Sequence, residues 1–377
     1  MEEEPTRDGA ALGGRLPETM RAAVFTAFGG PENIKVEEEW PVPKIKPDQY
    51  LLHVHATSVN PVDWKLVEGM LKYIGPNPPH VVGTDVSGVI VAVGQDCTKF
   101  KVGDEVYAVL GLLFGTCAEY AAVPESYLAF KPKNLSHEAA ATIPLVGLTG
   151  YQALLQHIHL KKDQKLLVLG GSGGTGSVAV QIAKHHIGAH VIATCSSRNA
   201  EWVHSLGADQ VIDYNTEDWG EVLAGEEVDA IYDTVGEPDS WHKAHGVLRS
   251  GGHFATIIPS NAKEHSAKEV LKTVGSIVNK KFWQAMGYLK YDIVTTKKNG
   301  SDLQKITELI ELGQVKPVVG KVYPFDETSN AFAESRAGRV RGKLAISLVP
   351  SSPDENAEND SRKASGNSSS SSSSSSS

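Results

Sequence analysis

The segment KLLVLGGSGGTGSVAVQIAK, residues 165–184, constrains the fold of this 377-residue chain more than any other. It begins as an apolar run suited to a strand covered on both faces, then turns to glycines and an apolar helical stripe. Gly171, Gly173 and Gly176 match G-x-G-x-x-G, a weak pattern alone because glycine is common here. Its place between a strand and a helix favours a phosphate-binding loop for a dinucleotide over a structural turn.

Strand and helix patterns alternate through the middle of the chain. Apolar runs are separated by spacers of helix length, at 165–170, 189–195, 209–214, 229–236 and 251–258. This β-α-β series predicts a parallel, doubly wound sheet with right-handed crossovers. Residues 20–109 instead hold short Val-rich runs between Pro and Gly, which is typical of a β-rich domain. Strand patterns return after residue 300, so we expect the late strands to rejoin the first domain.

Composition excludes several classes of protein. The net charge of −9 argues against binding nucleic acid, and no apolar stretch reaches the roughly 18 residues of a membrane span. Cys97, Cys117 and Cys195 are far apart, which fits neither a disulfide framework nor a zinc cluster and favours a reducing, cytoplasmic location. Residues 1–19 and the Ser-rich tail 350–377 lack the apolar residues of a core and are expected to be disordered.

The end of the second strand indicates which dinucleotide binds. An NAD site usually carries Asp or Glu there, to bond the ribose 2′-hydroxyl. Here the chain reads ATCSSRN, and no acid follows until Glu201. Ser196 and Ser197 offer hydroxyls and Arg198 a planar fork for a phosphate, so the sequence favours NADPH. Capping of the next helix by Ser197 or Asn199 is compatible with this interpretation.

Motifs in other parts of the chain extend this picture. In order they include FGGPENIKVEE, SVNPVDWK, VVGTDVSGVIVAVG, FKVGDEVYA, GTCAEYAAVP and LGADQVIDY. Over nearly all of residues 20–349 the chain resembles the quinone oxidoreductase family of the medium-chain dehydrogenase/reductase superfamily. Late segments such as KKFWQAMGY and GQVKPVVGKVYPFDETSNAF are similar to the reticulon-interacting oxidoreductase subgroup, and plant enone oxidoreductases share much of the pattern.

The resemblance implies an α/β protein of two domains. A GroES-like, β-rich catalytic domain would comprise residues 20–143 and 301–349, and a Rossmann NADPH-binding domain with a doubly wound parallel sheet would comprise residues 144–300. A cleft between them would hold the cofactor. The family also suggests a homodimer.

Cofactor-binding positions carry over where the motifs match. The implied pyrophosphate loop contains Ser172, Gly174 and Thr175 together with Gly173 and Gly176, and Ser196 falls at the 2′-phosphate position. The other implied positions are Thr149 near the nicotinamide, Tyr214 along the adenosine half, Thr234 where the subgroup has asparagine, and Arg339, Val340 and Arg341 in a C-terminal segment that reaches the cofactor.

The residue types predict no metal. Zinc alcohol dehydrogenases use Cys and His ligands, whereas the matching positions here are Asn60 and Thr84. No lobe of four close cysteines follows, and His53 and His55 share a strand face without an apparent third ligand. Without a Lewis acid, the easier reaction is hydride transfer to an acceptor that is already electrophilic, a quinone or an α,β-unsaturated carbonyl.

Candidate catalytic residues lie in and after the motif SVNPVDWK, which faces the nicotinamide in this family. Asn60 can donate an amide hydrogen bond to a carbonyl, or it is simply the turn residue before Pro61. Asp63 either braces this loop or transfers a proton. Tyr73 follows in the next loop, displaced from the usual position of a family tyrosine. Two alternative functions stay open: an enoyl-thioester reductase, and a non-catalytic NADPH-binding adaptor protein.

Overall fold

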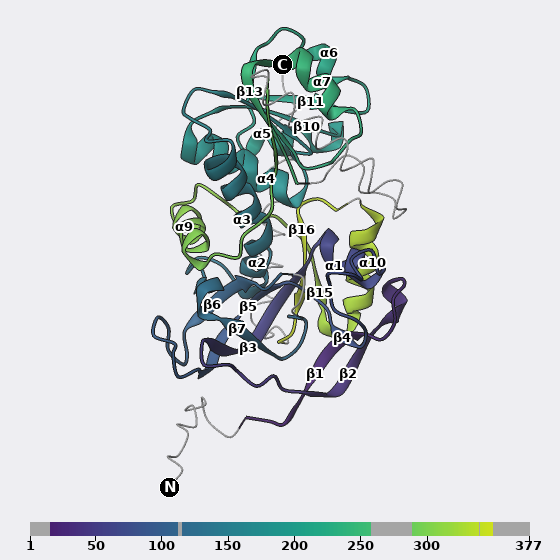
Figure 1. Ribbon diagram of the computed structural model, residues 1–377, viewed down its shortest axis with the longest axis vertical. Helices are drawn as coiled ribbons and strands as arrows, with labels where there is room; N and C mark the ends of the chain where they lie inside the picture. The colour runs from purple at the N-terminus through teal and green to yellow at the C-terminus, as the bar shows by residue number, and fades with distance from the viewer. Residues whose placement is uncertain (1–15, 112–114, 258–288, 339, 350–377) are drawn as a thin grey trace, which may run out of the picture.

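The computed structural model describes residues 16–111, 115–257, 289–338 and 340–349. Two sheets lie at opposite ends of the described molecule, with helices between them and around them (Figure 1). Within these residues no helix is both long enough and apolar enough to span a membrane.

The middle of the chain forms a six-stranded sheet in which every neighbouring pair is parallel. Its order is β11 (Gln210–Asp213), β10 (His190–Cys195), β9 (Lys165–Leu169), β12 (Val228–Asp233), β13 (Leu248–Thr256) and β14 (Lys290–Ile293). This is the Rossmann order, in which the third strand lies at one edge and the first is central. The prediction of a doubly wound sheet is confirmed, and the buried central strand β9 explains the continuous apolar run.

The helices between these strands follow the periodic stretches of the sequence. They are α4 (Gly174–Gln181), continued by the π-helical turn η4 (Ile182–Ile187), α5 (Ala200–Ser205) after the 3-10 turn η5 (Ser197–Asn199), α6 (Trp219–Val222) and α7 (Ser240–Val247).

The rest of the chain forms the β-rich part. Its larger sheet has the order β15 (Val319–Pro324), β16 (Lys343–Ser347), β3 (Gln49–Val59), β5 (Asp85–Val93), β6 (Glu105–Val109) and β8 (Ala129–Phe130), with β7 (Tyr120–Pro124) paired to β3. A smaller sheet contains β2 (Ile34–Pro41), β1 (Thr19–Phe25) and β4 (His80–Val81). β16 therefore pairs with β3, although all strands of the six-stranded sheet lie between them in the chain.

The remaining helices lie between and around these three sheets. They are η1 (Pro31–Asn33), α1 (Pro61–Val67), η2 (Glu125–Tyr127), α2 (His137–Ala141), α3 (Pro144–Gln152) with the π-helical turn η3 (Ala153–His157), α9 (Gly300–Glu311), η6 (Phe325–Glu327) and α10 (Thr328–Ala337). Helix α3 packs against both α4 and α9. It is almost entirely buried, and one hydrophobic cluster runs continuously from Tyr107 and Val109 of β6 to Leu166 and Val168 of β9. The two parts thus share a core at this junction.

Candidate active site

The glycine loop joins β9 to α4 and has the geometry of a phosphate cradle. Gly170 adopts a φ of +84°, and the Gly173 N–H donates to the Gly170 carbonyl oxygen over 3.0 Å. A Cβ at Gly176 would lie 2.1 Å from that same oxygen, so α4 can pack this closely on β9 only with glycine there. At Gly173 the nearest atom to an added Cβ is 3.5 Å away. Packing within the chain therefore leaves room at Gly173, as a ligand that approaches the backbone requires.

The start of α4 is left open for an anion. Gly173 is its N-cap residue, and no side chain caps this end, so the first amide groups of the helix point outward together with the positive end of its dipole. Ser172, Gly174 and Thr175 are half-buried around this opening. The residues present therefore fit a pyrophosphate.

The C-terminal segment lies against this loop. Gly342 forms an isolated parallel bridge with Gly173, and its N–H donates to the Ser172 carbonyl oxygen over 3.3 Å. Arg341, just before it, places its guanidinium 4.3 Å from the centre of the Trp202 ring on α5. Two predicted cofactor segments that are far apart in the chain thus meet. Val340 is half-buried beside them, and Arg339 lies outside the described residues.

The polar residues at the end of β10 lie close to the glycine loop. Ser196 is buried and its Oγ accepts from Asn199 Nδ2 over 3.4 Å, whereas Ser197 and Arg198 are exposed. Neither η5 nor α5 has a side-chain cap, so the alternative of capping by Ser197 or Asn199 is not observed. Tyr214 is 52% exposed, and its N–H donates to the Cys195 carbonyl oxygen over 3.3 Å, which places it beside this strand end.

An acid does lie next to this strand end. Asp213 of β11 is in register with Cys195, but its Oδ1 accepts from the backbone N–H and from Nδ2 of Asn215, at 3.0 and 2.8 Å. The hydrogen bond from the Asn215 backbone holds the pKa of Asp213 below its ordinary value. Its carboxylate is therefore engaged with its own turn and also accepts hydrogen bonds from the hydroxyl and backbone N–H of Ser197, which lower its pKa further.

Thr234 and Thr149 hold their hydroxyl groups within the protein. Thr234 Oγ1 donates to the Leu169 carbonyl oxygen over 2.6 Å, directly beside Gly170. Thr149 Oγ1 lies 2.6 Å from both the Leu145 carbonyl oxygen and Thr296 Oγ1. Thr234 thus lies beside the glycine loop, whereas Thr149 lies on α3 with its hydroxyl bonded to Leu145 and Thr296.

Asn60 and Asp63 open helix α1 and are buried. The Asn60 N–H donates to Asp63 Oδ2 over 2.7 Å, one half of a capping box. Asn60 Nδ2 donates to Thr84 Oγ1 (3.2 Å) and Asp85 Oδ2 (2.8 Å). Its Oδ1 accepts from Lys343 Nζ over 2.5 Å. Both amide hydrogens are engaged, so donation to a substrate carbonyl requires one of these bonds to break.

Burial controls the charges in this cluster. It raises the pKa of Asp63 to about 7, against the hydrogen bond from the Asn60 backbone N–H. It raises the pKa of Asp85 as well, where the charge of Lys343 and the hydrogen bonds from Asn60 and Ser58 act in the opposite direction. It lowers the pKa of Lys343, which Asp85 and Asp63 oppose. Asp63 therefore titrates near neutral pH, which is compatible with either of its predicted roles.

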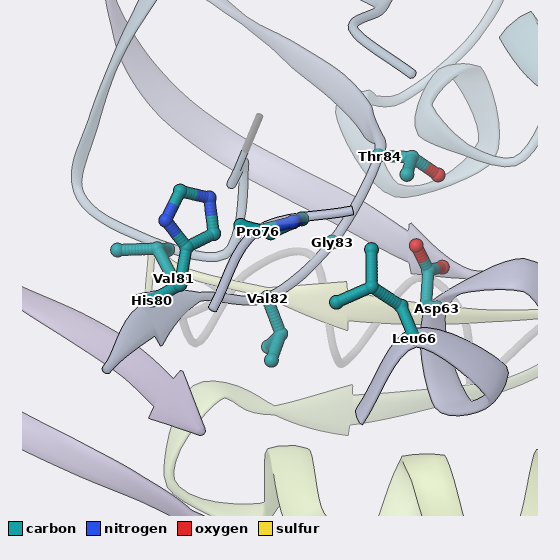
Figure 2. A pocket seen from close by; sticks show the side chains of 8 residues that line it. All are labelled: Asp63, Leu66, Pro76, His80, Val81, Val82, Gly83 and Thr84. Carbon is teal, nitrogen blue, oxygen red and sulfur yellow. The ribbon is translucent and has the colours of Figure 1, made fainter. Parts of the chain in front are cut away.

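A small pocket opens between α1 and the segment around β4. Asp63 and Thr84 lie at one end of it and His80 at the other (Figure 2), and His80 Nε2 is buried without a hydrogen-bond partner. The lining residues are Asp63, Leu66, Pro76, His80, Val81, Val82, Gly83 and Thr84. Tyr73 does not line it: the ring is 89% exposed, with the Lys72 ammonium 5.1 Å from its centre. The structure thus brings Asn60 and Asp63 together but leaves Tyr73 apart from them.

Sequence reasoning missed Asp85 and Lys343, which complete this cluster. Each stands in an otherwise apolar strand, in VVGTDVSGVIVAVG and GKLAISLV. A charged residue within a run that patterns as buried is a signal of a buried ion pair, because an unpaired charge would be too costly there.

Side chains at the positions that match zinc ligands, and the nearby Cys117, have other partners. Among the described residues, no group of three or more His, Cys, Asp or Glu side chains is placed to hold a metal ion. Asn60 is hydrogen-bonded to Thr84. Cys117 is buried, with its Sγ 3.5 Å from Thr328 Oγ1, and burial raises the pKa of its thiol to about 12.

A GroES-like sheet joined to a Rossmann sheet, with an open glycine loop at their junction, defines the class of two-domain nicotinamide oxidoreductases. Family models agree with this class: residues 46–133 match the alcohol dehydrogenase GroES-like domain, and residues 206–346 match the model described as zinc-binding dehydrogenase. The chain belongs to the quinone oxidoreductase family of the medium-chain dehydrogenase/reductases, and it is an oxidoreductase.

Several relatives support this assignment. The chain is 36% identical over 345 residues to a 2-methylene-furan-3-one reductase of Solanum lycopersicum, covering 89% of this chain and 81% of the relative. Identity and coverage are the same for an NADPH-dependent alkenal/one oxidoreductase of Arabidopsis thaliana chloroplasts. A mitochondrial NAD(P)H oxidoreductase of Bos taurus is 33% identical, with 88% and 89% covered. The solved quinone oxidoreductase from Coxiella burnetii superimposes with a TM-score of 0.75 at 29% identity, with 88% of this chain and 99% of that chain covered.

Proposed function

We propose that this protein is an NADPH-dependent, metal-independent reductase that transfers hydride to a quinone or an α,β-unsaturated carbonyl compound. The observation that carries the cofactor choice is the end of β10. There, Ser197 and Arg198 are exposed and Tyr214 is bound to the same strand end, while the neighbouring acid Asp213 is neutralised in part by hydrogen bonds from Asn215 and Ser197. A 2′-phosphate gains charge-assisted hydrogen bonds in such a place. The names of the plant relatives support the choice of NADPH and of an enone acceptor.

The residues of the chain would bind the cofactor and orient it toward the acceptor. NADPH supplies the hydride when bound. The open first turn of α4, with Gly173, Gly174 and Thr175, would hold its pyrophosphate, and Ser197 and Arg198 its 2′-phosphate. These contacts would hold the cofactor at the junction between the Rossmann sheet and the larger β-rich sheet.

The acceptor would lie near the opening of α1. Hydride addition to an enone or quinone leaves an anionic oxygen, which must be stabilised and then protonated. Buried polar groups at the opening of α1 supply an oriented electrostatic environment, with Asn60 held by three partners. Asp63, whose pKa burial raises to about 7, can hold a proton at neutral pH.

The cofactor choice is tested by titrating the wild type and Arg198→Ala with NADPH and NADH. We expect the variant to lose about 10- to 100-fold in NADPH affinity and almost nothing in NADH affinity, because a charge-assisted hydrogen bond contributes roughly 1.5–3 kcal/mol. Lys133→Ala removes another exposed positive charge, on the β-rich part, and is the control. Equal losses for both cofactors, or an equal effect of the control, would contradict this assignment.

The acceptor is tested with a panel of quinones, enones and enoyl thioesters at saturating NADPH. Reduction of enoyl thioesters alone would favour the alternative reductase. Binding of NADPH without turnover of any acceptor would favour the adaptor protein. A homodimer and a cytoplasmic location stay predictions, and the named relatives include mitochondrial and chloroplastic proteins.

A further inference from the structure

Lys343 lies where the two parts of the chain meet. It follows Gly342, the residue that pairs with Gly173 of the glycine loop, and only 6% of it is exposed. Its aliphatic stem lies against the first turn of α4, as the short distance of 2.9 Å between Lys343 Cδ and a Cβ built at Gly174 shows. The stem thus contacts the helix that opens toward the predicted pyrophosphate.

The ammonium group reaches the other side of the junction. Lys343 Nζ donates to the Val59 carbonyl oxygen over 2.8 Å and to Asn60 Oδ1 over 2.5 Å, and it lies 3.7 Å from Asp85 Oδ2. A buried ammonium is tolerated only where such acceptors and an opposite charge surround it. The desolvation of the Lys343–Asp85 pair is offset further, because the Asp85 carboxylate also accepts a hydrogen bond from Ser58 Oγ at 2.7 Å.

These contacts give the Asn60 amide one orientation. A cation at Oδ1 and a carboxylate at Nδ2 both favour the observed side chain over its flipped form. The Asn60 backbone in turn binds the Asp63 carboxylate. Asp85 extends the network to α3, since its Oδ1 accepts from the Leu145 N–H at 2.9 Å. One buried charge thus connects the glycine loop, α1 and α3.

We propose that Lys343 is a positioning residue for hydride transfer: its charge holds Asn60 and Asp85 in place at the acceptor side while its stem supports the cofactor loop. This inference rests on the proposed reductase function. Lys343 would control the geometry of the reaction through Asn60 and Asp85, without contacting the acceptor or the nicotinamide itself. Loss of the charge should therefore lower kcat far more than it weakens NADPH binding.

The test compares Lys343→Met with Lys131→Met. Methionine keeps an unbranched stem but removes the charge. Lys131 is a matched control, because it is also buried (7% exposed), donates to the Leu135 carbonyl oxygen at 2.6 Å and lies 3.4 Å from Glu105, away from the glycine loop. Both variants lose a buried cation, so both are expected to unfold at lower temperature than the wild type.

We expect Lys343→Met to lose at least about 30-fold in kcat with the acceptor that the wild type reduces, and less than about 3-fold in NADPH affinity. The control should change both quantities by less than about 3-fold when measured where it is fully folded. Should Lys343→Met not fold, Lys343→Gln keeps a donor but loses the charge, and the same selective fall in kcat is expected. A wild-type kcat in the folded variant, or a loss of NADPH affinity with unchanged kcat at saturation, would overturn the proposal.

A wild type that reduces no acceptor would refute the reductase function but still leaves the positioning role testable. The readout is then the fluorescence of NADPH bound to each protein. We expect Lys343→Met to change the emission of the nicotinamide at nearly unchanged affinity, and Lys131→Met to keep the wild-type emission. Identical emission in all three proteins would overturn the positioning role.

Discussion

Two glycines of the same loop should respond in opposite ways to alanine. Gly176 is required by packing within the chain, because its Cβ would lie 2.1 Å from the Gly170 carbonyl oxygen. Gly173 is not, because its nearest neighbour would be 3.5 Å away and its φ of −79° and ψ of 170° suit alanine. Gly176→Ala should therefore damage the fold, and Gly173→Ala the cofactor site.

The size of each effect follows from these distances. Real Cβ contacts essentially never fall below 3.0 Å, so α4 must move away from Gly170 by at least 0.9 Å (3.0 − 2.1) in Gly176→Ala. Overpacking of this kind costs about 1–3 kcal/mol. In Gly173→Ala the loss of unfolded-state entropy stabilises by about 0.4–1 kcal/mol, which offsets the weaker N-cap, so the change should stay within about 1 kcal/mol.

NADPH affinity should separate the two roles. A methyl group at residue 173 would occupy the space into which a pyrophosphate must come, so Gly173→Ala should weaken NADPH binding about 10- to 100-fold, or roughly 1.4–2.8 kcal/mol. Urea denaturation of the ligand-free proteins measures stability, and quenching of intrinsic fluorescence by NADPH measures affinity. Wild-type affinity in Gly173→Ala would refute a pyrophosphate at this loop. Wild-type stability in Gly176→Ala would refute the packing argument.

Three further changes test other parts of the structure. Ser197→Asp adds an acid at the exposed end of β10 and should weaken NADPH binding about 10-fold while sparing NADH, as a ratio of Kd values shows. Asp63, whose pKa burial raises from 3.8 to about 7, binds its proton more tightly when folded, so stability should fall as pH rises from 4 to 7, by up to about 4 kcal/mol. Asp63→Asn should flatten this slope in denaturation curves, and an unchanged slope would contradict the assignment. Tyr107→Phe removes the buried hydroxyl that lies 2.8 Å from Thr307 Oγ1 and should cost about 1–2 kcal/mol without changing kcat.

The nucleotide-binding sheet could be predicted because each of its first five strands is marked by an apolar run in its own short segment of the sequence. A buried parallel strand needs a continuous apolar run, and β9 has one. β14 was not predicted because it is only four residues long, Lys290–Ile293, lies at the edge of the sheet and has one fully buried residue, Tyr291. The glycine loop could also be predicted, because Gly176, which packing requires, and Gly173, which leaves room for a ligand, belong to one short motif.

The catalytic side of the site could be predicted only in part. Asn60 and Asp63 belong to one local motif, and their capping box follows from their spacing. Their partners Asp85 and Lys343 come from strands far away in the chain, so no local pattern connects them. The outward position of Tyr73 likewise depends on how the loop after α1 packs, which sequence spacing does not specify.

The register of β16 links the fold to the site. Leu344 and Ile346 point into an apolar cluster with Tyr323 and Phe332, and Lys343 lies on the opposite face because side chains alternate along a strand. A slip by one residue would bring the ammonium of Lys343 into that cluster without a partner, which costs several kcal/mol. The same slip would deprive Asp85 of its cation. The charge that we propose to position Asn60 therefore also disfavours wrong pairing of β16. Correct pairing of β16 in the larger β-rich sheet and assembly of the site consequently depend on the same residue.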